Sequence, residues 1–141
     1  MIKHIIWDMG NVLLLFDSQQ AVRDVLGDHP ALSEIIQATR MAPEWKMLDQ
    51  GIVSETDAVQ KMVHRAPHLE REIRFFMDHW DECLKPVPGM FQLVEEVRQA
   101  GYPLHLLSNA GVRFRRKNPR FPVFQMMDSI HISADMKLIK P

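Results

Sequence analysis

The sequence has 141 residues, of which 46% are hydrophobic and 25% are charged, and its formal net charge is −1. This composition is typical of a globular protein with a buried core and excludes a disordered chain. The balanced charge gives no electrostatic basis for binding nucleic acid, and no apolar run approaches the roughly 18 residues of a membrane span. The single cysteine, Cys83, cannot form an internal disulfide, and the N-terminus has no signal-peptide layout. We therefore expect a cytoplasmic protein that binds neither nucleic acid nor membranes.

The first half of the chain predicts one strand followed by helices. Residues 2–7 are apolar and rich in isoleucine and end at Asp8, which indicates a short buried strand. Asp17, with Gln20 three residues later, has the form of a capping box, and Gly27 is a suitable helix-ending glycine. Apolar residues at helical spacing predict further helices after Pro30, from Pro43 to Gly51, after Ser54, and over residues 69–84.

The second half alternates between helices and strands. Residues 85–89 (KPVPG) are typical of a linker, and residues 90–100 have the apolar spacing of a helix. Short apolar runs predict strands over residues 104–107 and 130–132. The basic residues 113–120 are expected to form a solvated loop or a broken helix. The whole order predicts an α/β protein with a helical subdomain inserted after its first strand.

Polar groups follow each of the three predicted strands. They are Asp8, the pair Ser108–Asn109, and Lys140. Parallel α/β sheets place function beyond the carboxyl ends of their strands. A carboxylate there can attack phosphorus or carbon to form a covalent intermediate, a serine hydroxyl can donate to an oxyanion, and a lysine can neutralise it. Each residue alone is explained as well by a turn, a helix cap or a solvated lysine, but the occurrence of all three after successive predicted strands is much harder to explain in that way.

These segments resemble the motifs of haloacid dehalogenase-like (HAD-like) hydrolases. Residues 5–12 (IIWDMGNV) are similar to the first motif, in the Asp-x-Gly-Asn-Val form of the branch that includes bacterial glucose-1-phosphate phosphatases. Residues 106–109 (LLSN) resemble the second motif, and residues 132–141 resemble the third. The resemblance implies a Rossmann-like parallel three-layer core formed by residues 1–16 and 85–141, with a helical cap over residues 17–84.

The resemblance also implies a role for each site residue. Asp8 is expected to be the nucleophile that forms an aspartyl-phosphate, and Asp8 with the carbonyl of Gly10 is expected to ligate Mg²⁺. Ser108, the backbone of Asn109, and Lys140 are expected to hold the phosphoryl group of a small phosphorylated metabolite such as a sugar phosphate. The cap is expected to close over the site, exclude water and choose the substrate.

Two features depart from the family pattern. Gly10 stands where most phosphatases of the superfamily have a second aspartate, so the proton donor to the leaving group is unassigned. The acidic pair of the fourth motif, which follows a further strand, is not among the 141 residues. We therefore expect a C-terminally truncated core whose last strands and Mg²⁺ site are incomplete and whose activity is impaired. Residues 2–7 would then form an exposed sheet edge that favours self-association.

Two alternatives stay open at this point. The first is a 2-haloacid dehalogenase-type hydrolase, whose nucleophilic aspartate needs neither the second aspartate nor a metal ion. The second is a non-catalytic remnant that acts only as a binding or dimerisation module. His64 and His68 have the spacing of a helical metal pair, but Pro67 interrupts that helix, and we expect no zinc there. The substrate, the proton donor and the oligomeric state do not follow from the sequence.

Overall fold

A computed structural model describes residues 2–141. The chain divides into two compact units. The first, here called the core unit, contains residues 2–15, 49–51 and 85–141, and the second, the helical unit, contains residues 16–48 and 52–84. No helix within residues 2–141 is both long enough and apolar enough to cross a membrane.

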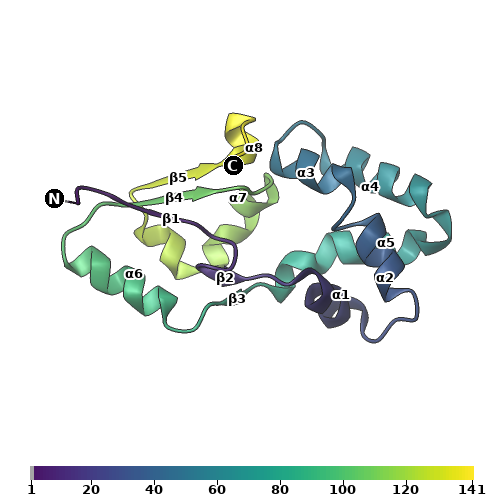
Figure 1. The fold of residues 1–141 in the computed structure, drawn as a ribbon, viewed down its shortest axis with the longest axis horizontal. Coiled ribbons are helices and arrows are strands. Elements are labelled where there is room, and N and C mark those ends of the chain that lie inside the picture. Colours follow the sequence, from purple (N-terminus) through teal and green to yellow (C-terminus); the bar gives the residue numbers. More distant parts are fainter. Residues whose placement is uncertain (1) are drawn as a thin grey trace. The chain divides into compact units, whose positions relative to one another are not determined.

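A three-stranded parallel sheet forms the centre of the core unit (Figure 1). Its strands are β1 (Ile5–Trp7), β4 (Leu104–Ser108) and β5 (Ser129–Ile132), in the spatial order β1-β4-β5. Trp7 is paired with Leu106, and Ser108 with Ile132. The prediction of an α/β fold built on a parallel sheet is therefore confirmed.

One face of this sheet is buried under helical segments. Side chains alternate along β4, so that Leu104, Leu106 and Ser108 are buried. Helix α6 (Met90–Gln99) lies on one side of the sheet (Figure 1) and buries Val94. The remaining helical segments of the second half are α7 (Arg113–Lys117), η3 (Asn118–Arg120), η4 (Pro122–Met126) and α8 (Ser133–Met136). The short α7 followed by η3 agrees with the expected broken helix in the basic stretch.

A tight turn follows β1 and brings the chain into a second, smaller sheet. The carbonyl of Met9 accepts the N–H groups of Leu13 and Leu14, each at 2.9 Å. Asn11 takes the left-handed conformation (φ 56°), which asparagine tolerates better than most residues. Strand β2 (Leu14–Leu15) then pairs antiparallel with β3 (Lys85–Pro86). The prediction that residues 85–89 form a linker is thus wrong for Lys85 and Pro86, which form a strand. Their pairing partner β2 precedes residues 17–84 in the sequence, so the local sequence does not reveal the pairing.

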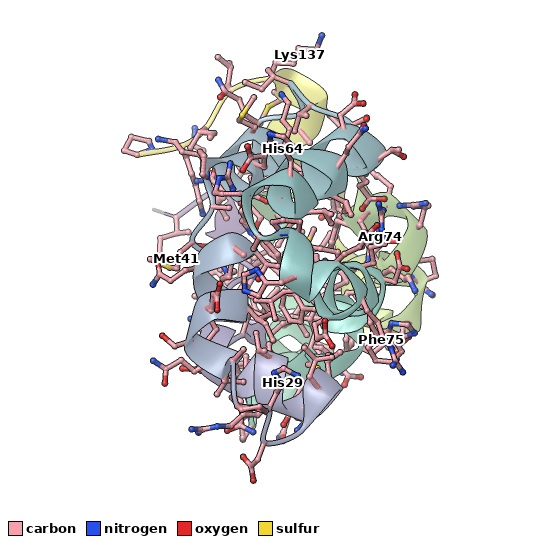
Figure 2. The ribbon with its side chains drawn as sticks, turned by 90° about the vertical axis from the view of Figure 1, so that its right-hand side faces the viewer. His29, Met41, His64, Arg74, Phe75 and Lys137 are labelled. Atoms are coloured by element: carbon pink, nitrogen blue, oxygen red, sulfur yellow. The ribbon has the colours of Figure 1, made fainter. Side chains whose placement is uncertain are left out.

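The helical unit has its own apolar core. Its helical segments are α1 (Ser18–Leu26), α2 (Leu32–Ala38), α3 (Pro43–Asp49), α4 (Glu55–Arg65), η1 (Pro67–Leu69), α5 (Glu70–His79) and η2 (Trp80–Cys83), although Asp49 belongs to the core unit. Val22, Ile35, Met62, Ile73 and Phe76 are completely buried in this core. Figure 2 labels three exposed side chains of this unit, those of Met41, His64 and Phe75.

The helix ends follow the predicted caps with one difference. Asp17 accepts the N–H of Gln20 at 2.7 Å, and Gly27 closes α1 with φ 71°. The Gln20 side chain, however, donates to Asp24 at 2.7 Å rather than returning to the start of the helix. The expected capping box is therefore only half formed, because a partner one turn further along the same helix face takes the glutamine amide.

Candidate active site

The nucleophile predicted from the sequence lies directly after β1. Asp8 follows the buried Trp7, so the strand places it at the carboxyl edge of the sheet. Its Oδ1 accepts the N–H of Met9 at 2.7 Å, which fixes the carboxylate against the turn. The Asp8 side chain is 41% exposed, so a ligand can reach it.

Lys140 provides a positive charge at the Asp8 carboxylate. Its Nζ lies 2.8 Å from Asp8 Oδ1 and also donates to the carbonyl of Leu107 at 3.1 Å. Because Trp7 is paired with Leu106, the residues that follow them, Asp8 and Leu107, lie side by side near the carboxyl ends of β1 and β4. The ammonium therefore bridges the ends of two neighbouring strands.

Asn109 holds the backbone of Lys140. Its Nδ2 donates to the Lys140 carbonyl at 3.2 Å, and its Oδ1 accepts the Lys140 N–H at 3.0 Å. These two bonds occupy both ends of the side-chain amide. The side chain of Asn109 thus positions Lys140, and the contact with substrate that the resemblance implies would fall to the Asn109 backbone.

Ser108 and Gly10 complete the predicted set, in different environments. Ser108 is the last residue of β4 and is only 3% exposed, at the same edge of the sheet as Asp8. Gly10 lies in the exposed turn after Asp8, and a Cβ added to it would meet no heavy atom within 4 Å. Gly10 is also absent from the residues with positive φ. Position 10 is therefore open to a side chain.

Ser133 is a further residue of this region that the sequence reasoning did not assign to the site. It is 1% exposed, directly after β5. Its Oγ accepts the N–H of Ala110 at 2.9 Å and donates to the carbonyl of Asp49. One hydroxyl thus ties the loop after β4 to the segment 49–51, and only its place after the third strand could have indicated it.

The segment 49–51 lies against the same residues. Gly51 has φ +70°, and a Cβ built on it would lie 2.2 Å from the carbonyl oxygen of Ala134. Only glycine allows this close approach of two backbones. Residues 49–51 are therefore fixed to the core unit, although the chain on both sides of them belongs to the helical unit.

The oxygen atoms near Asp8 fit a magnesium ion only in part. The carboxylate of Asp8 and the carbonyl of Gly10 are hard oxygen donors, which Mg²⁺ prefers. Within residues 2–141, however, no group of three or more His, Cys, Asp or Glu side chains gathers where it could hold a metal ion. These residues alone do not complete an octahedral site.

Comparisons with known proteins identify the fold. No family model matches the sequence, and no curated protein matches it. Among solved structures, a HAD family enzyme from Bacteroides thetaiotaomicron, in complex with magnesium and inorganic phosphate, aligns with 100% of this chain and 73% of its own, at 18% identity and a TM-score of 0.72. L-2-haloacid dehalogenase from Xanthobacter autotrophicus, with chloropropionic acid covalently bound, aligns with 100% of this chain and 60% of its own, at 18% identity and a TM-score of 0.66.

A third structure extends the range of activities. A putative β-phosphoglucomutase from Thermotoga maritima aligns with 99% of this chain and 64% of its own, at 17% identity and a TM-score of 0.57. This chain therefore spans between 60% and 73% of the length of the three proteins. At this level of identity the similarity concerns architecture. The chain has the α/β fold of the HAD family enzymes.

Proposed function

We propose that this chain is a phosphatase-type hydrolase that acts on a small phosphorylated metabolite through a covalent intermediate on Asp8. The observation that carries the proposal is the contact of 2.8 Å between the Asp8 carboxylate and the Lys140 ammonium. A carboxylate can act as a nucleophile, and a neighbouring cation balances the charge of a transferring phosphoryl group. The fold shared with an enzyme crystallised with magnesium and inorganic phosphate supports this assignment.

In the proposed reaction, an oxygen of Asp8 attacks the phosphorus atom in line with the leaving oxygen. The bond from phosphorus to the leaving oxygen breaks, and the alkoxide keeps the electron pair and takes up a proton. Lys140 balances the charge on the phosphoryl oxygens, and Ser108 and the backbone of Asn109 are proposed as further contacts. Water then attacks the phosphorus of the aspartyl-phosphate and loses a proton, which releases inorganic phosphate and restores Asp8.

The substrate class follows from the residue at position 10. Gly10 has no side chain that could protonate the leaving group, and general acid catalysis is worth about 10²–10⁴-fold. A leaving group that needs little protonation is therefore favoured. A sugar 1-phosphate is such a substrate, and the Asp-x-Gly-Asn-Val motif of residues 8–12 agrees with it.

Magnesium is the proposed cofactor, with Asp8 and the carbonyl of Gly10 as its ligands. When bound, Mg²⁺ would reduce the charge on the phosphoryl oxygens. Because the described residues supply only part of its coordination shell, the roles of Asp8 and Lys140 above are argued without it.

Two properties of the rest of the chain belong to the same proposal. The helices of residues 17–84 are proposed to act as the cap that selects the substrate. Strand β1 pairs only with β4 among the described residues, and Ile2 and Ile6 are 66% and 64% exposed. We propose that this apolar edge supports self-association, which light scattering over a concentration series would detect.

A dehalogenase-type reaction is the second candidate. One observation favours it: the described residues offer Asp8 with a neighbouring lysine but no cluster of acidic metal ligands. In that reaction, Asp8 would attack the carbon that bears the halogen, halide would leave with the bonding electrons, and water would hydrolyse the resulting ester.

Turnover in water labelled with ¹⁸O distinguishes the two reactions. An aspartyl-phosphate cleaved at phosphorus places the label in inorganic phosphate and leaves Asp8 unlabelled. An ester of Asp8 hydrolysed at its carbonyl carbon places the label in the Asp8 carboxylate, where mass spectrometry of the peptide detects it. The full chain would be incubated separately with sugar phosphates and 2-haloacids, each with and without Mg²⁺.

The variant Asp8→Asn is the control for both reactions and should abolish either label. Binding of inorganic phosphate to the wild-type chain and to Lys140→Met provides a readout that does not need turnover. Label in phosphate that persists in Asp8→Asn would contradict the proposal. If no substrate is turned over, and Lys140→Met binds inorganic phosphate as tightly as the wild-type chain does, the chain is instead a non-catalytic module.

A further inference from the structure

A row of three histidines and one serine crosses the sheet from His4, which precedes β1, to His131 on β5. His4 Nδ1 lies 3.0 Å from His105 Nε2, and His105 Nδ1 lies 2.8 Å from Ser129 Oγ. Ser129 Oγ in turn lies 2.9 Å from His131 Nε2. None of these residues belongs to the candidate active site.

The strand register explains why residues so far apart in the sequence meet. His105 is paired with Ile6 on one side and with Ser129 on the other. Residues two positions apart on a strand share a face, so His4 lies on the face of Ile6 and His131 on that of Ser129. This face is open, since Ile6 is 64% exposed and His4 and His131 are exposed.

Along the row, each residue can donate a hydrogen bond to the next, from His4 to His131. If His105 Nδ1–H donates to Ser129 Oγ, the serine hydroxyl is free to donate to His131 Nε2. The Nε2 of His105 then carries a lone pair, which accepts the Nδ1–H of His4. His105 is thereby held in one tautomer and one ring orientation, with its lone pair directed towards His4.

We propose that His4 Nδ1 and His105 Nε2 form a binding site for a divalent transition metal ion of the kind that prefers imidazole. Neutral imidazole is the commonest protein ligand for Cu²⁺, Ni²⁺ and Zn²⁺. Metal–nitrogen bonds of about 2.0–2.1 Å place two ligand nitrogens about 2.9 Å apart at a right angle and about 3.3 Å apart in a tetrahedron. The observed hydrogen-bond distance of 3.0 Å shows that the two nitrogens approach closely enough to share one ion, and the general affinity order of divalent metals places Cu²⁺ above Ni²⁺ and Zn²⁺.

The remaining residues of the row support the ligands. On metal binding, the His4 proton moves from Nδ1 to the solvent-facing Nε2, so both ligand nitrogens become lone-pair donors. Ser129 keeps its bond to His105 Nδ1 and acts as the outer partner that orients the ring. The described residues bring no third His, Cys, Asp or Glu to this pair, so water completes the coordination.

The nearby carboxylate of Asp128 belongs to the structure of the sheet. Its Oδ2 accepts the N–H of Leu104 at 2.8 Å, and its Oδ1 lies 3.6 Å from Arg98. The Asp128 carboxylate contributes negative charge near His105, but its two oxygens already interact with the Leu104 N–H and with Arg98. The metal site is therefore expected to depend on the two histidines.

Calorimetric titration of the full chain, prepared without a histidine tag, with CuCl₂, NiCl₂, ZnCl₂ and MgCl₂ tests the site. We expect one equivalent of Cu²⁺ to bind more tightly than Ni²⁺ and Zn²⁺, with no heat from Mg²⁺ at this site. Electron paramagnetic resonance of the Cu²⁺ complex should show coupling to two imidazole nitrogens. Bound Cu²⁺ should also raise the melting temperature, because the pair of histidines is brought together only in the folded chain.

Four variants separate this site from general surface binding. His4→Ala and His105→Ala should each weaken Cu²⁺ binding at least about tenfold, and Ser129→Ala should weaken it less, as expected for an outer partner. His64→Ala is the matched control, since it removes an exposed imidazole from the helical unit (Figure 2) and should change nothing. Equal loss in His64→Ala, or two-nitrogen coupling that survives in His105→Ala, would overturn the proposal.

Discussion

Asn109 and Lys140 exchange two hydrogen bonds, so that a side-chain amide on the loop after β4 holds the backbone of the lysine that faces Asp8. The position of the ammonium thus depends on a residue that does not touch the Asp8 carboxylate in any bond described above. This arrangement separates two contributions to the site, the charge of Lys140 and its placement.

Substitution at these two positions should therefore have different signatures. Lys140→Met removes the charge and should lower kcat by about 10²–10³-fold, as expected for the loss of one group that stabilises the transition state. Asn109→Ala keeps the charge and should cost less in kcat while weakening phosphate binding. Kinetics with the sugar phosphate identified by the labelling experiment provide the measurement. Equal losses in the two variants would show that Asn109 does more than position the lysine.

Ser133→Ala should destabilise the core unit without removing a charge. The substitution leaves the N–H of Ala110 and the carbonyl of Asp49 without their hydroxyl partner, which costs about 1–3 kcal/mol for a buried group. Urea unfolding measures the loss, and amide hydrogen exchange should show faster exchange at Ala110. The conservative Ser133→Thr, which keeps a hydroxyl, should restore part of the protection at Ala110; no difference between the variants would argue against the bond.

Gly51→Ala should lower the free energy of unfolding by more than the strain of placing alanine in the left-handed conformation. Gly51 and Gly89 have similar φ angles, +70° and +77°, so alanine is strained at both, by about 1–2 kcal/mol. At Gly89 a Cβ meets no atom within 4 Å, whereas at Gly51 it meets the Ala134 carbonyl at 2.2 Å. The difference between the unfolding free energies of Gly51→Ala and Gly89→Ala therefore measures the cost of the clash with the Ala134 carbonyl. A similar cost in both variants would mean that segment 49–51 moves away easily.

Gly10→Asp should increase phosphatase activity towards substrates with poor leaving groups. The Gly10 position is exposed and free of neighbouring atoms, so a side chain fits there without distortion. An added carboxylic acid two residues from the nucleophile can supply the missing proton, and such catalysis is worth up to about 10²–10⁴-fold. The ratio of rates for alkyl phosphates and sugar 1-phosphates should rise. Gly10→Asn, which fits the same space but cannot transfer a proton, should leave this ratio unchanged.

The ion pair between the buried Glu44 and the exposed Arg65 of the helical unit predicts a dependence of stability on pH. Glu44 is 5% exposed, and Arg65 Nη2 donates to its two carboxylate oxygens at 2.7 and 2.9 Å. Burial raises the pKa of Glu44, but the hydrogen bonds and charge of Arg65 outweigh it and hold the pKa below its ordinary value of 4.5. Since the folded form binds its proton less tightly than the unfolded chain, this stabilisation is present above pH 4.5 and is lost as the pH falls below it.

Removal of the arginine should weaken that dependence. In Arg65→Met, burial still raises the pKa of Glu44, and only its backbone hydrogen bond and the charge of Lys61 still lower it, so the pKa should rise above that of the wild type and less stability should be gained as the pH increases. Unfolding free energies of the two proteins between acid and neutral pH should therefore diverge with increasing pH. Glu44→Gln removes this titrating group and serves as the reference. A constant difference between wild type and Arg65→Met would contradict the assigned cause.

Features set by local pattern could be predicted from the sequence. The strands of the parallel sheet are short segments rich in apolar residues, and the helices of residues 17–84 show apolar residues at helical spacing. The positions of Asp8 and Ser108 follow from where the apolar runs end. Each of these depends on neighbouring residues alone.

Features that depend on distant partners could not be predicted. Strand β3 contains Pro86, which is unusual in a strand, and only the approach of Leu14 makes it one. The close contact of Gly51 with Ala134 and the bonds of Ser133 likewise join segments that share no sequence pattern. The role of the Asn109 side chain belongs to the same group, because its partner lies beyond two further elements.

The parallel pairing of β1 with β4 also has a consequence for how the chain reaches its folded state. Joining Trp7 to Leu106 closes a loop of roughly 100 residues, whereas helices that have already formed in between shorten the flexible part to roughly 40, which lowers the entropic cost of closure by about 0.8 kcal/mol. We therefore expect the helices of residues 17–84, which rest on local contacts, to form early and the Asp8–Lys140 pair to form last. During synthesis, the ribosome exposes Asp8 well before Lys140, so the contact between them can form only after most of the described chain has emerged.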